Sequence, residues 1–439
     1  MYVNNFANTA QVTSSSITSM FFLRRLQQAY YTHLMNPPVE FSTQVLKCDP
    51  SSISFASDYP TISCSDTSRA LDIAAHHLRD LSQTVVFPTE TVYGLGAFAQ
   101  STQATSKIFS TKGRPPDNPL IVHVSSLTML RTLLPLGYNL SRAYEVLMKH
   151  FWPGPLTLLF PRNADIIPNI VTANQSSVAI RMPSHPVARA LIAVSNLPLA
   201  APSANSSGKP SPTRVEHVLR DLDGKVPIIL DGGACDIGLE STVVDGLQTD
   251  GNIRILRPGG ITVEEIERVL HQEMHDCAQI PKVLVHRRDF QDKTIENAPT
   301  TPGMKYRHYS PSVPVTLICT SSSPPQGTNP LVVSAFLDSL VNSNDEVKIG
   351  VLAPSDSKLW GFFLPTEGVR WCRYDLGAIA EPSVTAHRLF DGLLTLEKEG
   401  VHLILIEEVK EDREGLAIMN RVRKAAGDSV WVSLPPDNQ

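Results

Sequence analysis

The sequence lacks the features that mark several common protein classes. Its six cysteines form no Cys-x-x-Cys pair and no zinc-ligand spacing, which predicts reduced thiols in an intracellular compartment and not a disulfide framework. No apolar run reaches the ~18 residues of a membrane span, which predicts no membrane segment. A Gly-x-x-x-x-Gly-Lys-[Ser/Thr] phosphate loop is also absent, and Gly94-x-Gly96 alone is a weak signal.

Acidic residues are missing from the first 34 positions, which contain two arginines, Arg24 and Arg25, and many polar uncharged residues. This composition is typical of a mitochondrial presequence, and it is equally compatible with a disordered extension. Met35 could start a shorter form without the segment. We therefore expect a cytoplasmic protein that also reaches mitochondria through its amino-terminal extension.

The length of 439 residues and the 42% hydrophobic content predict two or three domains with substantial cores. We expect an extension over residues 1–64, an α/β catalytic domain over 65–275, a linker over 276–312 and a small α/β domain over 313–439. Residues 69–257 carry 17 Lys and Arg against 14 Asp and Glu, whereas residues 312–439 carry 11 against 17. The first region therefore suits anionic ligands, and the second does not suit nucleic acid.

Strand and helix patterns alternate after residue 65, but several strands follow one another directly, which predicts a mixed sheet. Thr262 and Glu265 have the spacing of a capping box that begins a helix. Val401–Ile406 is a nearly continuous apolar run, as in a parallel strand that is buried on both faces. Residues 1–65 are irregular, and the regular pattern fades over 276–312.

This linker ends in a segment that is unusual for a spacer, since Lys305, Tyr306, Arg307, His308 and Tyr309 follow one another. Long loops without regular structure in compact proteins are often functional. We expect Tyr306, His308 and Tyr309 to form a lid over a site.

Polar residues gather where the predicted strands of the first region end, which is where open α/β sheets bind ligands. The segments are Thr89–Tyr93, Lys112–Arg114 with Asn118, Ser203–Asn205, Leu239–Thr242 and Arg257–Gly260. Their cations, hydroxyls and glycines suit the binding and neutralisation of phosphate. No nucleophile elbow and no Cys/His pair lies nearby. The inventory favours phosphoryl or nucleotidyl transfer, in which positioning and charge stabilisation dominate.

Each segment also has a purely structural interpretation. Ser203 and Asn205 are common helix caps, Ser241 and Thr242 could simply open a strand, and Arg257 before Pro-Gly-Gly could lie in a surface turn. His123 sits in an apolar strand, where a histidine is usually a core residue.

The chain resembles the YrdC-like threonylcarbamoyl-adenylate synthases. The matching motifs, in the family's order, are Pro88-Thr89-Glu90-Thr91-Val92-Tyr93-Gly94-Leu95-Gly96, Lys112-Gly113-Arg114-Pro115, Trp152-Pro153-Gly154-Pro155-Leu156-Thr157, Arg181-Met182-Pro183, Ser203-Ala204-Asn205-x-Ser207-Gly208, Ser241-Thr242-Val243-Val244 and Arg257-Pro258-Gly259. Pro302-Gly303-Met304-x-x-x-His308-Tyr309-x-Pro311 and Leu416–Arg421 resemble the longer members with two domains. The resemblance covers roughly residues 65–430.

The resemblance implies a twisted open sheet around a concave pocket, followed by a Rossmann-like domain. It also implies the condensation of L-threonine, bicarbonate and ATP to threonylcarbamoyl-AMP and pyrophosphate. Mg²⁺ would accompany ATP, with no metal held directly by side chains. A separate tRNA threonylcarbamoyl transferase would use the product, and weak or transient contact with tRNA is compatible with that role.

The residue roles that the resemblance implies fall into two groups. Lys112 and Arg114 would be catalytic and would hold phosphate, together with the nucleotide-binding residues Asn118, Ser203, Asn205, Ser241, Thr242 and Arg257. Threonine would be bound by Thr89, Thr91, Tyr93, His123 and Arg181.

Two other classes of function stay open at this point. The cations of the first region could instead make its concave face an RNA-binding surface. A carbamoyl-transfer enzyme that acts on another amine or on a protein would also use an anion-binding pocket. Tight, salt-dependent tRNA binding without ATP would favour the first, and dependence on carbamoyl phosphate the second.

Overall fold

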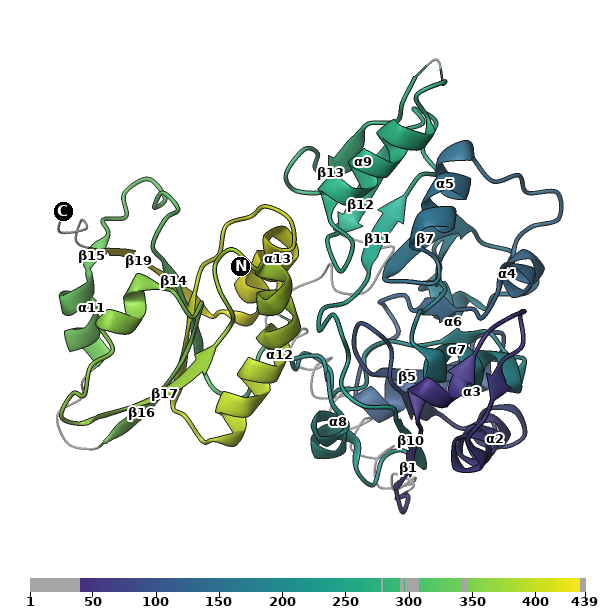
Figure 1. Cartoon of the computed structure of the whole chain (residues 1–439), viewed down its shortest axis with the longest axis horizontal. Helices are drawn as coiled ribbons and strands as arrows, with labels where there is room; N and C mark the ends of the chain where they lie inside the picture. Colours follow the sequence, from purple (N-terminus) through teal and green to yellow (C-terminus); the bar gives the residue numbers. More distant parts are fainter. Residues whose placement is uncertain (1–39, 278, 293–295, 297–307, 341–345, 435–439) are drawn as a thin grey trace, which may run out of the picture. The chain divides into compact units, whose positions relative to one another are not determined.

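The computed structural model describes residues 40–277, 279–292, 296, 308–340 and 346–434. Ser42–Gln439 forms one compact unit, and its strands build a larger and a smaller sheet (Figure 1). In addition, β2 (Ile53–Ser54) and β3 (Thr61–Ile62) pair as a two-stranded ribbon. Among the described residues, no helix has the length and apolar character of a membrane span. All six cysteines are free thiols.

The larger sheet has eleven strands and is mixed, as predicted. In spatial order they are β1 (Gln44–Lys47), β10 (Ile228–Asp231), β4 (Val85–Phe87), β5 (Gly94–Phe98), β9 (Leu199–Ala200), β6 (Ile121–His123), β8 (Ser177–Arg181), β7 (Leu156–Pro161), β11 (Thr242–Asp245), β12 (Ile253–Arg257) and β13 (Val283–Val285). Strand β4, for example, pairs in parallel with β10 and antiparallel with β5. The polar segment with Ser203 and Asn205 follows the short strand β9 in the middle of this order.

Helices pack on this sheet through apolar stripes at helical spacing. They are α2 (Ser65–Arg79), α3 (Thr102–Lys112), α4 (Leu127–Leu133), α5 (Arg142–Phe151), α6 (Asn169–Thr172), α7 (Pro186–Ser195), α8 (Val215–Leu222) and α9 (Val263–Glu273). Helix α2 buries Leu71, Ala74 and Leu78 and packs against α7. Helix α9 begins with the predicted capping box, in which Thr262 and Glu265 bond each other's backbone N–H groups.

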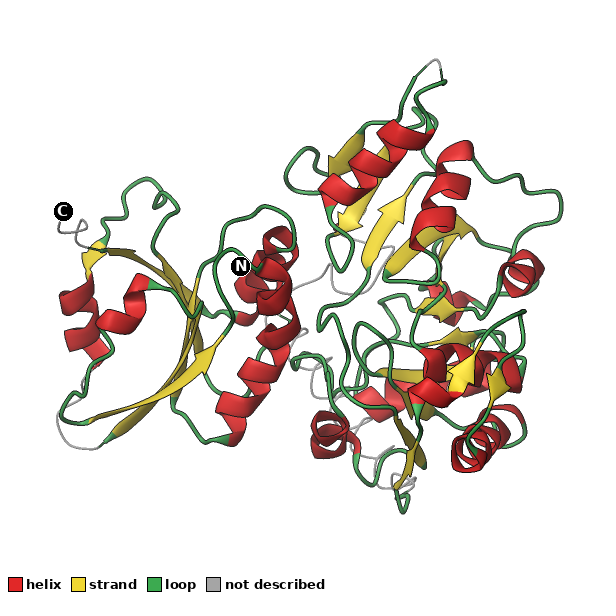
Figure 2. Ribbon diagram, in the orientation of Figure 1, coloured by secondary structure: helices red, strands yellow, loops and turns green. Residues whose placement is uncertain are grey.

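The smaller sheet has six strands, all paired in parallel. In spatial order they are β15 (Leu331–Val332), β19 (Asp428–Ser433), β14 (Val315–Cys319), β18 (Leu403–Glu407), β16 (Val347–Ala353) and β17 (Val369–Asp375). Helices α12 (Pro382–Lys398) and α13 (Gly415–Ala425) cover one face, and α11 (Val333–Leu340) lies on the other (Figures 1 and 2). The apolar run that predicted a parallel strand forms β18, which lies between β14 and β16.

Seven of the described strands were not predicted from the sequence; β2, β3 and β15 have two residues each, and the other four, β1, β13, β17 and β19, are longer. Strand β1 lies in the segment that we expected to be irregular, and β13 lies in the expected linker. Strands β17 and β19 carry exposed or half-buried residues at most positions. All four lie at or next to a sheet edge, so their apolar patterns are short, and they are strands because a neighbouring strand accepts their hydrogen bonds.

Candidate active site

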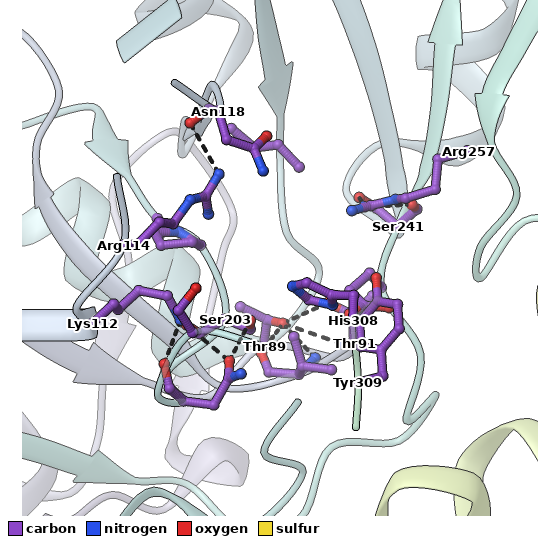
Figure 3. Close-up of a pocket in the computed structure, with 18 of the residues that line it drawn as sticks. Thr89, Thr91, Lys112, Arg114, Asn118, Ser203, Ser241, Arg257, His308 and Tyr309 are labelled. Carbon is purple, nitrogen blue, oxygen red and sulfur yellow. Dashed lines mark hydrogen bonds between the residues drawn. The ribbon is translucent and has the colours of Figure 1, made fainter. Parts of the chain in front are cut away.

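One cavity of about 220 Å³ collects most of the predicted site residues. Its lining includes Thr89, Thr91, Lys112, Arg114, Asn118, His123, Arg181, Ser203, Asn205, Ser241, Arg257, His308 and Tyr309. Figure 3 shows Lys112 and Arg114 across this space from Ser241 and Arg257. We call this space the catalytic cavity, because cations converge on it from segments that are far apart in the chain.

Lys112 is the last residue of α3, and Gly113 turns the chain sharply after it. Gly113 has φ 62°, and its N–H bonds the carbonyls of Phe109 and Ser110, a left-handed helix ending that glycine adopts at least cost. The Lys112 ammonium donates to the carbonyls of Ser203 and Asn205 and, at 3.2 Å, to Oδ1 of Asn205. Burial, and then the charge of Arg114, hold the pKa of Lys112 well below its usual range. A phosphate ligand would reverse that shift.

Arg114 is oriented before any ligand binds. Its guanidinium donates to the carbonyl of Asn118 at 2.9 Å (Figure 3) and to that of Pro119 at 3.3 Å. Burial lowers the pKa of Arg114 to about 10, against the opposing charge of Asp117, so the guanidinium stays charged at neutral pH. A fixed, desolvated fork of this kind suits phosphate. Asn118 holds Arg114 through its backbone carbonyl.

Ser203 and Asn205 follow β9 and form a network with Lys112. The Ser203 hydroxyl donates to Oδ1 of Asn205, and the Asn205 amide donates to the carbonyls of Ser206 at 2.9 Å and Lys209 at 2.8 Å. Asn205 therefore holds the loop that accepts the Lys112 ammonium. Its predicted direct contact with the nucleotide stays a prediction.

Arg257 and Ser241 form the opposite wall of the catalytic cavity. The Arg257 guanidinium donates to the Ser241 carbonyl at 2.8 Å, and the Ser241 hydroxyl lies 2.7 Å from that of Thr157. Gly259 explains the Pro-Gly-Gly segment, because a Cβ at this position would lie 2.3 Å from the carbonyl oxygen of Glu240. The glycine lets the chain after Arg257 lie directly against the Glu240–Ser241 loop.

The predicted threonine side is built around a buried ion pair of Arg181 and Glu90, 2.6 Å apart. Arg181 also donates to the Thr91 hydroxyl at 2.9 Å, and Thr89 donates to the Val92 carbonyl at 2.6 Å. Glu90 balances the charge of Arg181, which orients Thr91 and also lines the cavity, and the predicted contact of Arg181 with threonine stays a prediction.

His123 lines the same side as an uncharged ring. Burial, and then the charge of Arg181, lower its pKa to about 3, so the ring is neutral throughout the physiological range. It packs edge-on against Phe87, with ring centroids 6.3 Å apart.

His308 and Tyr309 lie in the catalytic cavity, although they follow the end of β11 at Asp245 by 63 and 64 positions in the chain. Tyr309 is fully buried, has φ 63°, and packs on Phe390 with ring centroids 5.2 Å apart. Ser310 N–H bonds the Gly208 carbonyl at 2.9 Å. Burial lowers the pKa of His308 to about 3 and raises that of Tyr309 to about 12, so both rings are neutral. The third residue of the expected lid, Tyr306, lies outside the described residues.

Two predicted binding residues do not line the cavity. The Tyr93 hydroxyl donates to the Gly233 carbonyl at 2.6 Å, and its ring is part of the hydrophobic core. The Thr242 hydroxyl donates to the Ile261 carbonyl and accepts from the Ile261 N–H at 3.0 Å. Both side chains sit one position along a strand or turn from residues that do line the cavity, and neighbouring side chains in an extended chain point in opposite directions.

Sequence reasoning did not assign a role to Glu240 or Arg421. Glu240 lines the cavity, accepts from the Ser211 hydroxyl at 2.7 Å and from Arg421 at 3.0 Å. Although burial alone would raise it, Arg421 and Arg257 hold the pKa of Glu240 down at about 2. The only sequence signal for Arg421 was its place at the end of the Leu416–Arg421 motif.

Two family models match the chain. One, for Sua5, YciO and YrdC and described as telomere recombination, matches residues 80–259. The other, described as the C-terminal domain of threonylcarbamoyl-AMP synthase, matches residues 261–427.

Individual proteins match over most of the chain. A threonylcarbamoyl-AMP synthase from Schizosaccharomyces pombe is 45% identical over 82% of this chain and 89% of its own length. The Bacillus subtilis protein of the same name is 43% identical over 81% and 93%. The crystal structure of Pyrococcus abyssi Sua5 in complex with L-threonine superposes with a TM-score of 0.67, at 35% identity, over 89% of this chain and all of that one.

Proposed function

This chain belongs to the Sua5/YciO/YrdC family and is an enzyme that forms threonylcarbamoyl-AMP, and we propose that the catalytic cavity carries out this reaction. The amine of L-threonine forms a bond to the carbon of bicarbonate with loss of water. An oxygen of the resulting carbamate then attacks the α-phosphorus of ATP, and the bond to the leaving pyrophosphate breaks.

The convergence of Lys112, Arg114 and Arg257 on one cavity carries this proposal. Lys112 and Arg257 are buried and Arg114 is half-buried, so their charges act in a medium less polar than water, where attraction to phosphate is stronger. None of them has to move out of solvent at the moment of reaction. Ser203 and Ser241 add hydroxyls on opposite sides, and we assign them to oxygens of the nucleotide and the carbamate.

Threonine binding is assigned to the side of Thr89, Thr91 and His123. P. abyssi Sua5 was crystallised with L-threonine. In this chain the Thr91 hydroxyl is held by Arg181 and Thr89, so it can present its remaining lone pair to a ligand. The neutral His123 ring offers an apolar wall that would suit the threonine methyl group.

We assign a covering role to His308 and Tyr309. With both in place the cavity measures about 220 Å³, whereas pockets for drug-sized ligands measure ~300–1,000 Å³. We infer that these residues withdraw to admit ATP and threonine together, and their return would exclude water from the labile product.

Mg²⁺ is assigned as the partner of ATP. Among the described residues, no group of three or more His, Cys, Asp or Glu side chains is placed to hold a metal ion. The cavity's cations and hydroxyls fit a metal held mainly by phosphate oxygens and water, the usual arrangement for Mg²⁺. When bound, the ion neutralises phosphate charge.

The cellular context of the reaction also follows from its chemistry. The product is a mixed anhydride that water destroys, so a threonylcarbamoyl transferase acting on tRNA must take it over promptly, with at most transient contact between tRNA and this chain.

We assign the enzyme to the cytoplasm and, through its acid-free first 34 residues, to mitochondria. Amino-terminal sequencing of protein from both compartments tests this assignment, because a single species beginning at Met35 would contradict it.

The decisive assay measures pyrophosphate release from ATP and Mg²⁺, with threonine or bicarbonate omitted in turn, and follows radiolabelled bicarbonate into product. Release that needs both substrates, with label in an adenylate, is the expected outcome. ATP turnover that ignores threonine would contradict the proposal.

A further inference from the structure

A second cavity, of about 540 Å³, adjoins the catalytic cavity at Arg257, which lines both. We call it the basic groove, because five of its lining residues are cations, namely Arg257, Arg287, Arg288, Arg423 and Lys424. Its walls come from the end of β12, the turn after β13 and one side of α13. Arg257 forms part of its floor and is buried, whereas Arg287 and Arg288 are exposed.

The turn after β13 holds two of these arginines in a defined position. The Arg287 N–H bonds the Phe290 carbonyl at 2.8 Å, and the Val285 N–H bonds the Asp289 carboxylate at 2.7 Å. Arg287 itself has φ 68°, a left-handed conformation that a side chain as large as arginine rarely adopts. Backbone strain of this kind is common in segments that present a side chain to a ligand.

Helix α13 supplies the opposite wall. Asn420, Arg423 and Lys424 are three and four positions apart and therefore share one side of the helix. Lys424 donates to the Asn420 side chain at 2.7 Å, and Arg423 pairs with Glu411.

Positive charge exceeds negative charge among the described residues that line the groove, where five basic side chains face one carboxylate, Glu411. Glu411 pairs with Arg423, and carboxylates outside the lining also attract these cations, since Asp289 lies 3.0 Å from Arg288, Glu296 lies 3.7 Å from Arg287, and Glu240 acts on Arg257 and Lys424. Burial, and then repulsion from Arg421 and Arg257, lower the pKa of Lys424 to about 7. An anion in the groove would relieve that repulsion.

The lining indicates which kind of anion fits. The one aromatic ring among the described lining residues is His286, which already packs against Phe290 with ring centroids 5.4 Å apart, whereas five basic side chains are available to phosphate oxygens. The lining therefore favours a compound made of phosphate groups. The reaction releases one such compound, pyrophosphate, in the neighbouring cavity that shares Arg257.

We propose that the basic groove is a pyrophosphate site that receives the co-product from the catalytic cavity by way of Arg257. This inference rests on the proposed function. It gives the second α/β region a direct task, because α13 supplies one wall of the groove.

The test is calorimetric titration of the full-length protein with sodium pyrophosphate in the absence of ATP. The natural sequence is expected to bind two equivalents, one in each cavity. A Lys112→Met/Arg114→Gln variant should keep only the groove site. Adding Arg287→Asn and Arg423→Gln to that variant should weaken the remaining site by about 10-fold or more, because two partly exposed charge-assisted contacts are lost. Asn is chosen at position 287 because it tolerates positive φ.

Arg268→Gln on α9 is the matched control, since it removes an exposed arginine that does not line the groove. It should leave both sites intact. If Arg287→Asn disturbs folding, as judged by circular dichroism, Arg288→Gln with Arg423→Gln serves instead. A single equivalent in the natural sequence, or a second site that survives the groove substitutions, would overturn the proposal.

Failure of the proposed function is visible separately. Pyrophosphate binding is counted without turnover, whereas the synthase activity is read from labelled bicarbonate in the adenylate. If two equivalents bind but no adenylate forms, the groove binds pyrophosphate and the proposed function is wrong. If an adenylate forms but only one equivalent binds, the proposed function stands and the proposal of a pyrophosphate site in the groove is wrong.

Discussion

Arg421 and Glu240 form a buried ion pair between residues 181 positions apart, with Nε of the arginine 3.0 Å from Oε2 of the glutamate. Arg421 has no exposed surface and also donates to the Pro258 carbonyl. It therefore contacts both loops that carry cavity residues, the one before Ser241 and the one after Arg257. Helix α13 of the second region thus helps to shape the catalytic cavity.

Replacing one partner of this pair should be strongly destabilising. Arg421→Gln or Glu240→Gln leaves a buried charge without its counterion, which costs about 3–5 kcal/mol. The combined Arg421→Met/Glu240→Leu variant should cost less than the sum of the single changes. Urea unfolding measures the three free energies. The control is Arg423→Gln on the same helix, whose ion pair is about half exposed and contributes about 0–1 kcal/mol.

Glu240 should also make the free energy of unfolding depend on pH in the acidic range. Its pKa is held at about 2 in the fold against an ordinary value of 4.5, so the carboxylate contributes fully above about pH 4.5. The contribution is lost as the pH falls from 4.5 toward 2. Glu240→Gln should flatten the unfolding free energy over that range, and an unchanged slope would contradict the assignment.

Replacing a phosphate-binding cation should lower kcat/KM for ATP more than it lowers the affinity of the protein for threonine. Arg114→Gln or Lys112→Met removes a hydrogen bond to a charged group worth about 1.5–3 kcal/mol, which lowers kcat/KM for ATP at least ~10-fold. Threonine affinity, measured by calorimetry, should change little. Lys107→Met, on the same helix but outside the cavity, should behave like the natural sequence.

Tyr309 should retain the product. Tyr309→Ala removes the ring that lines the cavity and packs on Phe390, so water enters more readily. ATP turnover should continue while the yield of threonylcarbamoyl-AMP per ATP falls. Tyr309→Phe keeps the ring and serves as the matched control. Equal yields for the alanine variant and the natural sequence would show that the residue does not cover the site.

Replacing Tyr93 distinguishes a structural role of its side chain from a role in threonine binding. Tyr93→Phe removes the hydroxyl that donates to the Gly233 carbonyl, and we expect a loss of about 1–2 kcal/mol in unfolding free energy. The affinity for threonine should be unchanged, because the side chain does not reach the cavity. A large loss of threonine affinity with normal stability would restore the prediction made from the sequence.

Lys424 should destabilise the fold below neutral pH. Its pKa of about 7 lies below the ordinary value of 10.5, so the folded protein releases a proton between these values that the unfolded chain retains. The resulting penalty is largest below pH 7 and declines as the pH rises from 7 toward 10.5. Lys424→Met should raise the urea midpoint more at pH 6 than at pH 9. Lys398→Met, at an exposed position on α12, should not.

Much of the site was predictable because its chemistry is local. The pairing of Lys112 and Arg114 around Gly113 is a property of three adjacent residues, and the ending of α3 at this glycine follows from its backbone freedom. The capping box at Thr262 and the buried parallel strand β18 were likewise predicted from short patterns. In each case the relevant interactions lie within a few positions of one another or depend on hydrophobicity alone.

Other features depend on contacts between distant segments, which no local pattern encodes. Whether Thr91 or Tyr93 faces the cavity depends on the twist and register of the chain after β4. The pairing of Glu240 with Arg421, and the meeting of β12, the turn after β13 and α13 around the basic groove, exist only once the two sheets are folded.

The sequence by itself determined the family, the reaction and the residue types that bind phosphate, because these depend on short motifs and their order. Only the tertiary structure decided which of those side chains share a cavity, which are uncharged and which hold other residues in position. Burial and neighbouring charges set the last two properties, as the low pKa values of His123 and Glu240 show, and both arise from the packing of segments far apart in the chain.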